Sequence, residues 1–402
     1  MSYSVRRDSD KVVYRTWEAR ENERDRLRIA VLKLDHVGDF WMALAPLREL
    51  RKRFSKAHIT LIVGSWNLET ARTFLLADEY VSFDFFKVNP RIGKKHRDPG
   101  QIREQLKGSF DLAIDMRVPD ETREVLLAID ARHRAAIADR CIYPKIDLAI
   151  LPGKIKLRRN ILYKLLQKAS LSGLIPRNWI DRRANRDQMR MHHMAETLSL
   201  LVAKAAAHFE ENIDPTQQHE LPALQGLAPV VVAPFSNSTL RDWPVENYRA
   251  LIVTLSQTRN VILVGRNEDA ASLQTMVSAA REAGGGNIDC ATDLNERQFN
   301  ELLGSAALVI SNNSGAGHVA AQLGRPTLGI FTASHLPELW GFQGPRVSML
   351  MSTIECRGCG IDVVRRCPQR VRCKSDITAE HVLAEIEALA GHDNQQPTTI
   401  AM

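Results

Sequence analysis

The stretch from Leu308 to Phe331, LVISNNSGAGHVAAQLGRPTLGIF, constrains the fold more than any other part of the chain. It predicts a buried strand, a polar turn at 311–315, a short helix over 318–323 and a second strand over 327–331. The first backbone N–H groups of such a helix have no intrahelical partner, and the helix dipole is positive there. A phosphate at this position gains hydrogen bonds and charge stabilisation together. The stretch therefore predicts an α/β unit with a turn suited to an anion.

Two other interpretations of this turn stay open. Asn313 and Ser314 are good helix caps, so the turn could be closed by its own side chains without a ligand. Gly315, Gly317 and Ala320 also satisfy a G-x-G-x-x-A dinucleotide pattern. That pattern expects an acidic residue at the end of the next strand, and this chain offers none there. The dinucleotide interpretation is therefore the weaker one.

Apolar strand-like segments alternate with helical ones along the chain, which is typical of parallel sheets with crossover helices. A chain of 402 residues is long enough for two such domains. Strands are predicted at 29–34, 59–64 and 112–116, and again at 230–233, 261–264 and 308–310, with a helix from about 41 to 54. The predicted organisation is a charged arm over 1–27, domains over 28–210 and 230–390, a proline-containing linker over 211–229, and a disordered tail over 391–402.

Charge and hydropathy limit the classes of partner. No run reaches the 18 or so apolar residues of a membrane span, and the charged N-terminus has no apolar signal core, so we expect a cytoplasmic protein. The net charge is +7, and the excess of basic residues lies in the first half of the chain. These residues are densest from Lys154 to Arg190. This basic amphipathic segment fits a phosphorylated acceptor or peripheral contact with an anionic membrane face, or else a solvated face packed on the core. No aromatic stacking segment accompanies it, so no nucleic-acid partner is expected.

Polar loops follow several of the predicted strands. Ligands in open α/β sheets bind at the carboxyl ends of strands, so the loops after residues 34, 233, 264 and 310 should face a shared cleft. They contain Gly38 and Asp39 in DHVGD, Arg241 in PFSNSTLRDWP, and Glu268 and Asp269 in GRNEDA. Plainer roles are a helix cap for Asp39, a surface cation for Arg241, and first-turn acids at 268 and 269.

These loops resemble, as a set, the motifs of glycosyltransferase family 9, the ADP-heptose lipopolysaccharide heptosyltransferases. IAVLKLDHVGDFWMALAPLRELRKRF is similar to the opening of that family, and FDLAIDMR, at 110–117, to its internal D-x-x-I-D element. APFSNSTLRDWPVENYRAL resembles the start of its second domain, and SNNSGAGHVAAQLGRPTLGIF its nucleotide-diphosphate loop. The resemblance covers roughly residues 28–390, and the four motifs stand in the family's order.

The resemblance implies an α/β GT-B fold, with two Rossmann-like domains facing a central cleft. It also implies inverting sugar transfer from a nucleotide diphosphate sugar without a catalytic metal. Asp39 matches the general base that would take a proton from the acceptor hydroxyl. The implied donor-binding residues are Arg241, Glu268, Asp269, Asn313, Ser314, Gly315 and His318. Gly38 and Arg117 fall on the acceptor side.

Two departures from the family pattern concern the donor. The family usually has an aspartate where this chain has Asn313, and a lysine where it has Arg241. Exchanging a carboxylate for an amide removes a charge from the donor pocket. The resemblance therefore predicts a nucleotide sugar but leaves its base and sugar open, with ADP-heptose as the first expectation.

Four cysteines near the C-terminus form a separate motif. Cys356, Cys359, Cys367 and Cys373 have the spacing C-x2-C-x7-C-x5-C, which suits a tetrahedral zinc or iron ion. Four protein ligands leave no open coordination position, so such a metal would be structural. Reduced structural thiols or a redox-sensitive pair are the alternatives. Cys141 and Cys290 are expected to be lone buried thiols.

Three classes of function compete at this point. The first is a glycosyltransferase whose acceptor is an anionic, lipid-linked glycan such as a lipopolysaccharide core. The second transfers the sugar to a protein side chain or another glycan. The third is a non-catalytic, metal-stabilised module that binds nucleic acid or membrane.

Overall fold

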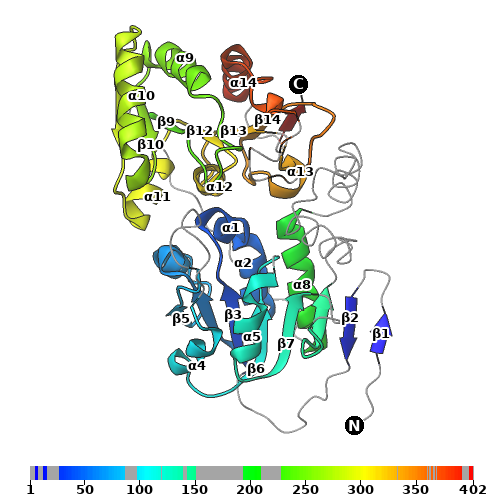
Figure 1. Cartoon of the computed structure of the whole chain (residues 1–402). Coiled ribbons are helices and arrows are strands. Elements are labelled where there is room, and N and C mark those ends of the chain that lie inside the picture. The colour runs from blue at the N-terminus through cyan, green and yellow to red at the C-terminus, as the bar shows by residue number, and fades with distance from the viewer. Residues whose placement is uncertain are drawn as a thin grey trace. The chain divides into compact units, whose positions relative to one another are not determined.

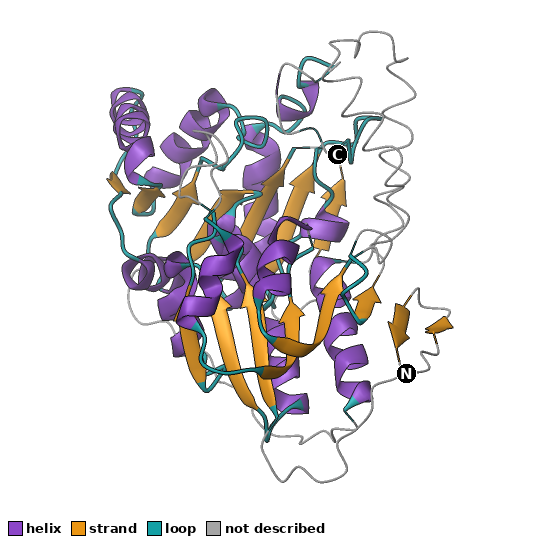
Figure 2. Cartoon of the chain, turned by 60° about the horizontal axis from the view of Figure 1, so that its bottom comes forward, coloured by secondary structure: helices purple, strands orange, loops and turns teal. Residues whose placement is uncertain are grey.

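The computed structural model describes residues 5–7, 12–15, 27–86, 97–118, 120–138, 143–150, 193–209, 228–332, 334–359, 361, 364, 367, 369–391 and 398–401. The chain divides into two compact units. Unit 1 comprises Met1–Lys154 and Met194–Gln218, and unit 2 comprises Ile155–His193 and His219–Met402. Each unit is built around one sheet, and Figures 1 and 2 show these sheets with their helices.

Unit 1 contains an eight-stranded sheet in the order β1-β2-β8-β7-β6-β3-β4-β5. Its strands are β1 (Val5–Arg7), β2 (Val12–Arg15), β3 (Arg28–Lys33), β4 (His58–Val63), β5 (Glu79–Ser82), β6 (Phe110–Asp115), β7 (Ala131–Ile137) and β8 (Leu148–Ile150). Strands β3 to β8 pair in parallel, whereas β2 runs antiparallel to both β1 and β8. Strand β3 is almost wholly buried, which explains its nearly continuous apolar sequence.

The strand order fixes where unit 1 can hold a ligand. From β3 the chain first adds β4 and β5 on one side, and then returns to add β6, β7 and β8 on the other. The side on which new strands are added therefore changes between β3 and β6, although the two strands are parallel. In open α/β sheets the crossover loops leave such a switch point in opposite directions, and ligands bind there at the carboxyl ends of the two strands.

Helices of unit 1 are α1 (Val37–Met42), α2 (Leu44–Arg53), α3 (Leu68–Thr73), α4 (Ile102–Gln105), α5 (Arg123–Ala128) and α8 (Met194–His208). Short 3-10 turns occupy Ser65–Asn67, Pro99–Gln101 and Asp120–Thr122. The helix predicted from about 41 to 54 begins earlier, at Val37, and is interrupted at Ala43. Pro46 explains the interruption, because it has no N–H to bond the carbonyl of Met42.

Unit 1 packs α4 and α5 against the sheet through a cluster that includes Leu32, Phe83, Phe110 and Leu126. A fully buried ion pair joins Asp115, the last residue of β6, to Arg123, the first residue of α5. Both side chains are 0% exposed. The Arg123 guanidinium also donates to the carbonyls of Arg117 (2.7 Å) and Ile137 (2.6 Å), so it ties the loop after β6 to β7.

Unit 2 contains a seven-stranded, fully parallel sheet in the order β11-β10-β9-β12-β13-β14-β15. Its strands are β9 (Val230–Ala233), β10 (Val261–Val264), β11 (Ile288–Ala291), β12 (Leu308–Asn312), β13 (Thr327–Phe331), β14 (Val347–Met351) and β15 (Thr398–Ala401). The side on which new strands are added changes between β9 and β12. This is the same arrangement as in unit 1, so unit 2 has its own switch point.

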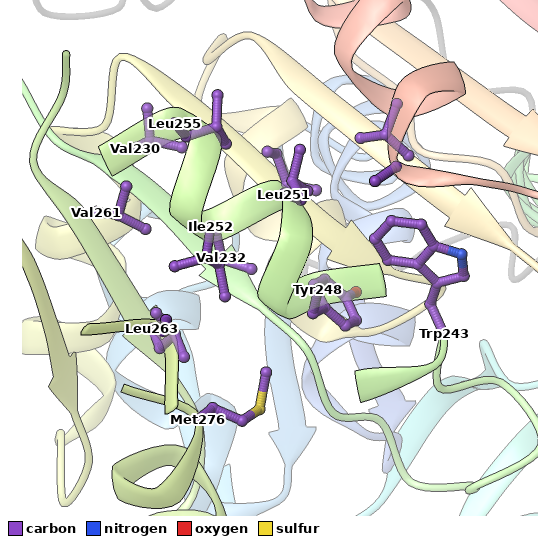
Figure 3. Close-up of a cluster of buried hydrophobic side chains, with 14 of the residues drawn as sticks. Val230, Val232, Trp243, Tyr248, Leu251, Ile252, Leu255, Val261, Leu263 and Met276 are labelled. Carbon is purple, nitrogen blue, oxygen red and sulfur yellow. The ribbon is translucent and has the colours of Figure 1, made fainter. Parts of the chain in front are cut away.

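Helices of unit 2 are α9 (Val245–Ser256), α10 (Ala270–Glu282), α11 (Glu296–Gly304), α12 (Gly315–Gln322), α13 (Pro337–Trp340) and α14 (Ala379–Gly391). Short 3-10 turns occupy Asn267–Asp269 and Arg372–Lys374. Residues of α9, α10 and α14 share one core cluster with the inner faces of β9, β10, β12 and β13. Figure 3 shows the part of this cluster around Trp243, Tyr248 and Ile252. A second cluster joins α12 and α13 to β13 and β14 through Phe331, Leu339 and Phe342.

The predicted α/β fold with two parallel-sheet units is confirmed, with differences at the chain ends. Residues 5–7 and 12–15, within the predicted arm, form β1 and β2. Residues 398–401, within the predicted disordered tail, form β15 beside β14. The basic segment from Lys154 to Arg190, Cys141 and most of the predicted linker lie outside the described residues. Among the residues that are described, no helix is both long and apolar enough to cross a membrane.

The buried pair of unit 1 gives a test of this fold. Replacing Arg123 by Met keeps the bulk but leaves the Asp115 carboxylate buried without its cation. We expect the free energy of unfolding to fall by about 3–5 kcal/mol, measured by urea denaturation. Arg132→Met, at an exposed arginine on β7, serves as the control and should change it by less than about 0.5 kcal/mol. Equal losses in the two variants would contradict the assigned role of Arg123.

Candidate functional site

A buried cluster of charges lies at the switch point of unit 1. Lys33, at the end of β3, donates to the Asp35 carboxylate (Nζ–Oδ2 2.5 Å) and to the carbonyl of Met116 (2.9 Å). Arg117, in the loop after β6, reaches the other oxygen of the same carboxylate (Nε–Oδ1 2.5 Å). Lys33 and Asp35 are each only 3% exposed. The Asp35 carboxylate therefore joins the loops after β3 and β6 with two cations.

Arg117 is held from three further directions. Its guanidinium pairs with Glu121 (Nη1–Oε2 2.7 Å) and lies 4.4 Å from the centre of the Phe86 ring. Its backbone N–H donates to the Asp115 carboxylate (3.2 Å). Arg117 was predicted on the acceptor side, and the structure places it at the switch point with its charge shared between two carboxylates.

Asp39 lies in the first turn of α1, four residues after Asp35, with Gly38 buried before it. Burial raises the pKa of the Asp39 carboxyl above its ordinary value of 3.8, and the negative charge of Asp35 raises it further. Lys33, His36 and Arg117 lower it in part. In contrast, the Lys33 and Arg117 charges hold the pKa of Asp35 below its ordinary value despite burial. The Asp35 carboxyl therefore loses its proton more readily than an ordinary aspartate, and the Asp39 carboxyl holds its proton more readily.

The backbone around Asp35 is also fixed. The carbonyl of Asp35 accepts from the Trp66 indole (2.8 Å) and from the Asn67 side chain (3.0 Å). Lys33 and Asp35 belong to the same sequence motif as Asp39, but no role was predicted for either. A signal was present, because a lysine inside an otherwise apolar buried strand needs a nearby anion.

At the switch point of unit 2, α12 begins at Gly315 rather than at the predicted His318, and Ser314 is its N-cap residue. The Ser314 hydroxyl shares a hydrogen bond with Ser311 (2.7 Å), and no side-chain hydrogen bond caps this described helix. The plain interpretation of the turn, in which its own side chains close the helix, is therefore not what the structure shows. Backbone N–H groups at the start of α12 keep the orientation that suits an anion.

Asn312 organises the loops around this turn, and its side chain is fully buried. Its Oδ1 accepts from the Trp243 backbone N–H (3.0 Å) and the Tyr248 hydroxyl (2.9 Å), and its Nδ2 donates to the carbonyl of Pro234 (2.5 Å). Arg241 donates to the carbonyl of Asn313 (3.2 Å), so its guanidinium lies next to the turn before α12. Three of these hydrogen bonds therefore join the loop after β9 to Asn312 at the end of β12 and to Asn313 after it.

His318, in α12, is only 5% exposed. Burial lowers its pKa to about 3, assisted by the charges of His193 and Arg241, so its imidazole is neutral at physiological pH. Phe342 packs edge-on to it, with ring centres 4.8 Å apart. The Phe342 ring also lies so close to Gly317 that a Cβ atom there would clash with it, which explains why a glycine is needed inside this helix.

Glu268 and Asp269 have structural partners in the described chain. The Asp269 carboxylate accepts from the backbone N–H of Arg266 (3.2 Å) and from its side chain (3.1 Å), which caps the turn before α10. Glu268 pairs with the same guanidinium (2.6 Å). Arg266 also donates to Asn237 in the loop after β9 (3.4 Å). These contacts favour the plainer role for both acids, although their loop borders the switch point.

The four cysteines share one neighbourhood without forming a ready metal cage. Burial raises the pKa of the Cys359 thiol to about 12; a hydrogen bond from Ile361 lowers it, and the other three thiols raise it. Among the described residues, however, no three His, Cys, Asp or Glu side chains are arranged to hold a metal ion. The Cys367 sulfur instead accepts from the N–H of Val371 (3.3 Å).

The predicted residues thus gather at two places. Gly38, Asp39 and Arg117 lie together at the switch point of unit 1. Arg241, Asn313, Ser314, Gly315 and His318 lie together at that of unit 2, with Glu268 and Asp269 in the neighbouring loop. The residues that sequence reasoning missed are the ones that fix these loops, namely Lys33, Asp35, Asp115, Glu121, Arg123 and Asn312.

Comparisons with known proteins bear on the family and the fold. Residues 177–369 match the family model described as glycosyltransferase family 9 (heptosyltransferase). The structure of E. coli ADP-heptose LPS heptosyltransferase II is similar at 17% identity, with a TM-score of 0.61 over 90% of this chain and 98% of that one. A glycosyl transferase family 9 structure from Veillonella parvula is similar at 16% identity, with a TM-score of 0.62 over 91% and 97%.

A third similar structure is TibC of enterotoxigenic E. coli, described as an iron-containing dodecameric glycosyltransferase. It matches at 12% identity and a TM-score of 0.51, over 94% of this chain and 82% of that one. A comparison with curated protein sequences gives no match. The resemblance to family 9, the GT-B fold class and the assignment to the glycosyltransferase enzymes are thereby confirmed.

The pKa of Asp39 is raised and that of Asp35 is lowered. Replacing each residue by asparagine should therefore change the stability of the fold in opposite directions. The pKa of Asp39 is raised in the folded state, so its ionisation costs stability as pH rises through that value. We expect Asp39→Asn to raise the melting temperature at neutral pH. This gain should vanish in acid, below the ordinary pKa of 3.8, where the wild-type carboxyl is neutral in both states. Thermal unfolding followed across pH measures it.

Asp35→Asn is the matched control. The pKa of Asp35 is lowered in the folded state, so its carboxylate stabilises the fold above its ordinary pKa and loses this effect as pH falls. Removing it at neutral pH leaves two buried cations, at a cost of about 3–5 kcal/mol. A lower melting temperature for Asp39→Asn at neutral pH would refute the assigned pKa of Asp39.

Proposed function

We propose that this chain, which carries a glycosyltransferase family 9 domain, is an inverting transferase that moves a sugar from a nucleotide diphosphate sugar to a hydroxyl group. The proposed acceptor is a lipopolysaccharide core or a similar anionic glycan, and the proposed general base is Asp39. ADP-heptose is the first donor to consider, because the similar E. coli enzyme is described as an ADP-heptose transferase.

The observation that carries the proposal is the state of Asp39 at the switch point of unit 1. A general base works best when its pKa approaches the working pH. Burial and the nearby Asp35 carboxylate both raise the pKa of Asp39 in that direction. Asp35 itself is occupied by Lys33 and Arg117, which leaves Asp39 as the carboxylate suited to accept a proton.

On the donor side, three features suit a diphosphate. The first backbone N–H groups of α12 have no side-chain cap, Arg241 supplies a fixed positive charge beside them, and His318 is neutral. A neutral imidazole can donate one hydrogen bond without carrying a charge of its own. Preoriented donors of this kind stabilise charge that develops in a transition state, each contributing about 3–4 kcal/mol.

The proposed reaction is a single displacement. The acceptor hydroxyl oxygen forms a bond to the anomeric carbon while its proton passes to the Asp39 carboxylate. The bond from that carbon to the diphosphate oxygen breaks, and the nucleoside diphosphate leaves with the electron pair. Attack opposite the leaving group inverts the anomeric configuration, and the donors around α12 and Arg241 would stabilise the departing charge.

Asn313 bears on the donor sugar. It is buried at the turn before α12, and its carbonyl is held by Arg241. An amide at this position can both donate and accept hydrogen bonds, whereas the aspartate usual in the family only accepts. The proposal therefore requires a sugar with a hydrogen-bond pattern that fits an amide, and ADP-heptose is to be compared with other ADP-, GDP- and UDP-sugars.

Gly38 and Arg117 stay on the acceptor side of the proposal. Gly38 is buried beside Asp39 in the first turn of α1, and its proposed role is to let the acceptor approach the Asp39 carboxylate. Arg117 is slightly more exposed than Lys33, at 8% against 3%, and it pairs with the partly exposed Glu121. Peripheral contact with the cytoplasmic membrane face would follow from a lipid-linked acceptor and belongs to the same proposal.

Nucleotide release tests this function. Purified wild-type protein should release nucleoside diphosphate from one of the sugar nucleotides when a core glycan acceptor is present. Asp39→Asn should reduce kcat by at least about a hundredfold, the usual contribution of a general base, while donor binding in a thermal-shift assay is retained. Activity of the Asp39→Asn variant equal to that of the wild type would exclude Asp39 as the base. Transfer only to protein or to an uncharged glycan would reassign the acceptor.

We also propose that Cys356, Cys359, Cys367 and Cys373 together hold one structural zinc or iron ion. Their spacing and their shared neighbourhood support this, as does the description of TibC as iron-containing. The described thiols are not arranged as a metal cage, so binding requires them to turn toward a common centre. Four thiolates would fill a tetrahedral shell, and no catalytic metal is proposed.

Metal analysis decides this point. Wild-type protein should contain about one zinc or iron ion per chain, as a single site with four thiolate ligands requires. Cys356→Ser should lose it and unfold at a lower temperature. Cys290→Ser, which removes a thiol from β11 outside the group, should keep the metal. Negligible zinc and iron in both wild type and Cys356→Ser would show that the four thiols serve another purpose.

A further inference from the structure

The segment that carries the four cysteines is fastened to the carboxyl-end loops of unit 2 at both of its ends. Its first end touches the region that follows β13. Arg357 forms an ion pair with Glu338 of α13. Gly358, at a left-handed φ of 75°, lies so close to Leu336 that an added Cβ would come within 3.1 Å of its side chain.

The second end touches the loop after β9, which is defined here as the Arg241 loop, residues 234–244. Lys374 donates from Nζ to the carbonyl of Thr239 (2.9 Å). The buried indole of Trp243 donates to the carbonyl of Ile377 (2.8 Å), and the side chain of Asn247 reaches the same carbonyl (3.2 Å). Residues 374–377 therefore hold both the middle and the end of the Arg241 loop.

Between its anchors the segment has an unusual backbone. Arg370 and Val371 are consecutive residues at φ of 50° and 54°, in the left-handed region that L side chains rarely adopt. A β-branched residue such as Val371 is especially disfavoured there. Such a conformation persists only where the surrounding contacts over-determine it. The turn that presents Lys374 is thus fixed by its surroundings.

The contacts on the far side of the Arg241 loop connect it to the donor turn. Trp243 is bonded through its backbone N–H to Asn312, and Arg241 is bonded to the carbonyl of Asn313. Only one residue separates Thr239 from Arg241. A displacement at the Lys374 contact therefore moves the guanidinium that faces the start of α12.

We propose that residues 370–377, at the second end of the cysteine segment, are a brace that positions the Arg241 loop for the donor, and that Lys374 is its positioning residue. Lys374 acts on Arg241 through the backbone of Thr239 and does not itself touch the diphosphate. The brace rests on the proposed function for its role in donor binding. The structural coupling between the cysteine segment and the Arg241 loop does not depend on the proposed function.

Lys374→Met tests the brace in the full-length protein. With its hydrogen bond lost, amide hydrogen exchange in residues 236–243 should accelerate about five- to tenfold, as the loss of one such bond implies. The kcat/KM for the donor should fall by a similar factor, with KM raised, because the displaced Arg241 both binds the diphosphate and stabilises the departing charge in the proposed reaction. Lys374→Arg, which keeps a donor on a long side chain, should restore most of both readouts.

Arg372→Met is the matched control, because it removes the same charge from an exposed residue of the same turn. It should change neither exchange in the loop nor KM. Unaltered exchange in Lys374→Met would overturn the brace, as would equal effects of the two methionine variants. If wild-type protein binds and turns over no sugar nucleotide, the proposed function fails, and hydrogen exchange alone then decides whether the brace exists.

Discussion

Both halves of this molecule depend on one constraint, the reversal of strand order in a parallel sheet. The reversal lies between β3 and β6 in unit 1 and between β9 and β12 in unit 2. In each unit a polar contact spans the reversal, from Arg117 to Asp35 in the first and from Arg241 to the Asn313 carbonyl in the second. Loops that would otherwise diverge are thereby held together where ligands bind in such sheets.

The two switch points are stabilised by different means, which suits the different chemistry proposed for them. Unit 1 uses buried charge, because Asp35 is compensated by Lys33 and Arg117, and Asp115 by Arg123. A buried compensated carboxylate influences the proton affinity of its neighbour in a medium of low dielectric. Unit 2 uses neutral hydrogen bonds around Asn312, and Arg241 lies beside them through its bond to the Asn313 carbonyl.

Sequence reasoning succeeded where burial dictates the residue type. Strands 230–233, 261–264 and 327–331 were predicted with the observed bounds, since strands buried on both faces need unbroken apolar runs. It failed where pairing or local geometry decides. Residues 398–401 have no apolar run, yet they pair with β14. The helix of residues 37–53 breaks at Ala43. The donor-binding role of Asp269 stays a prediction, because its carboxylate accepts from the backbone N–H of Arg266 and spacing alone does not distinguish such a contact from one with a ligand.

The sequence by itself determined the fold class, the family resemblance and the chemical character of the loops, because these depend on residue type and order. Only the tertiary structure decided which charges meet. Lys33 and Arg117 are 84 positions apart in the chain and converge on Asp35 because β3 and β6 are neighbours in the sheet. The same holds for Lys374 and Thr239, which are 135 positions apart. Pairings over such separations follow from strand order, and strand order is set by the packing of the whole sheet.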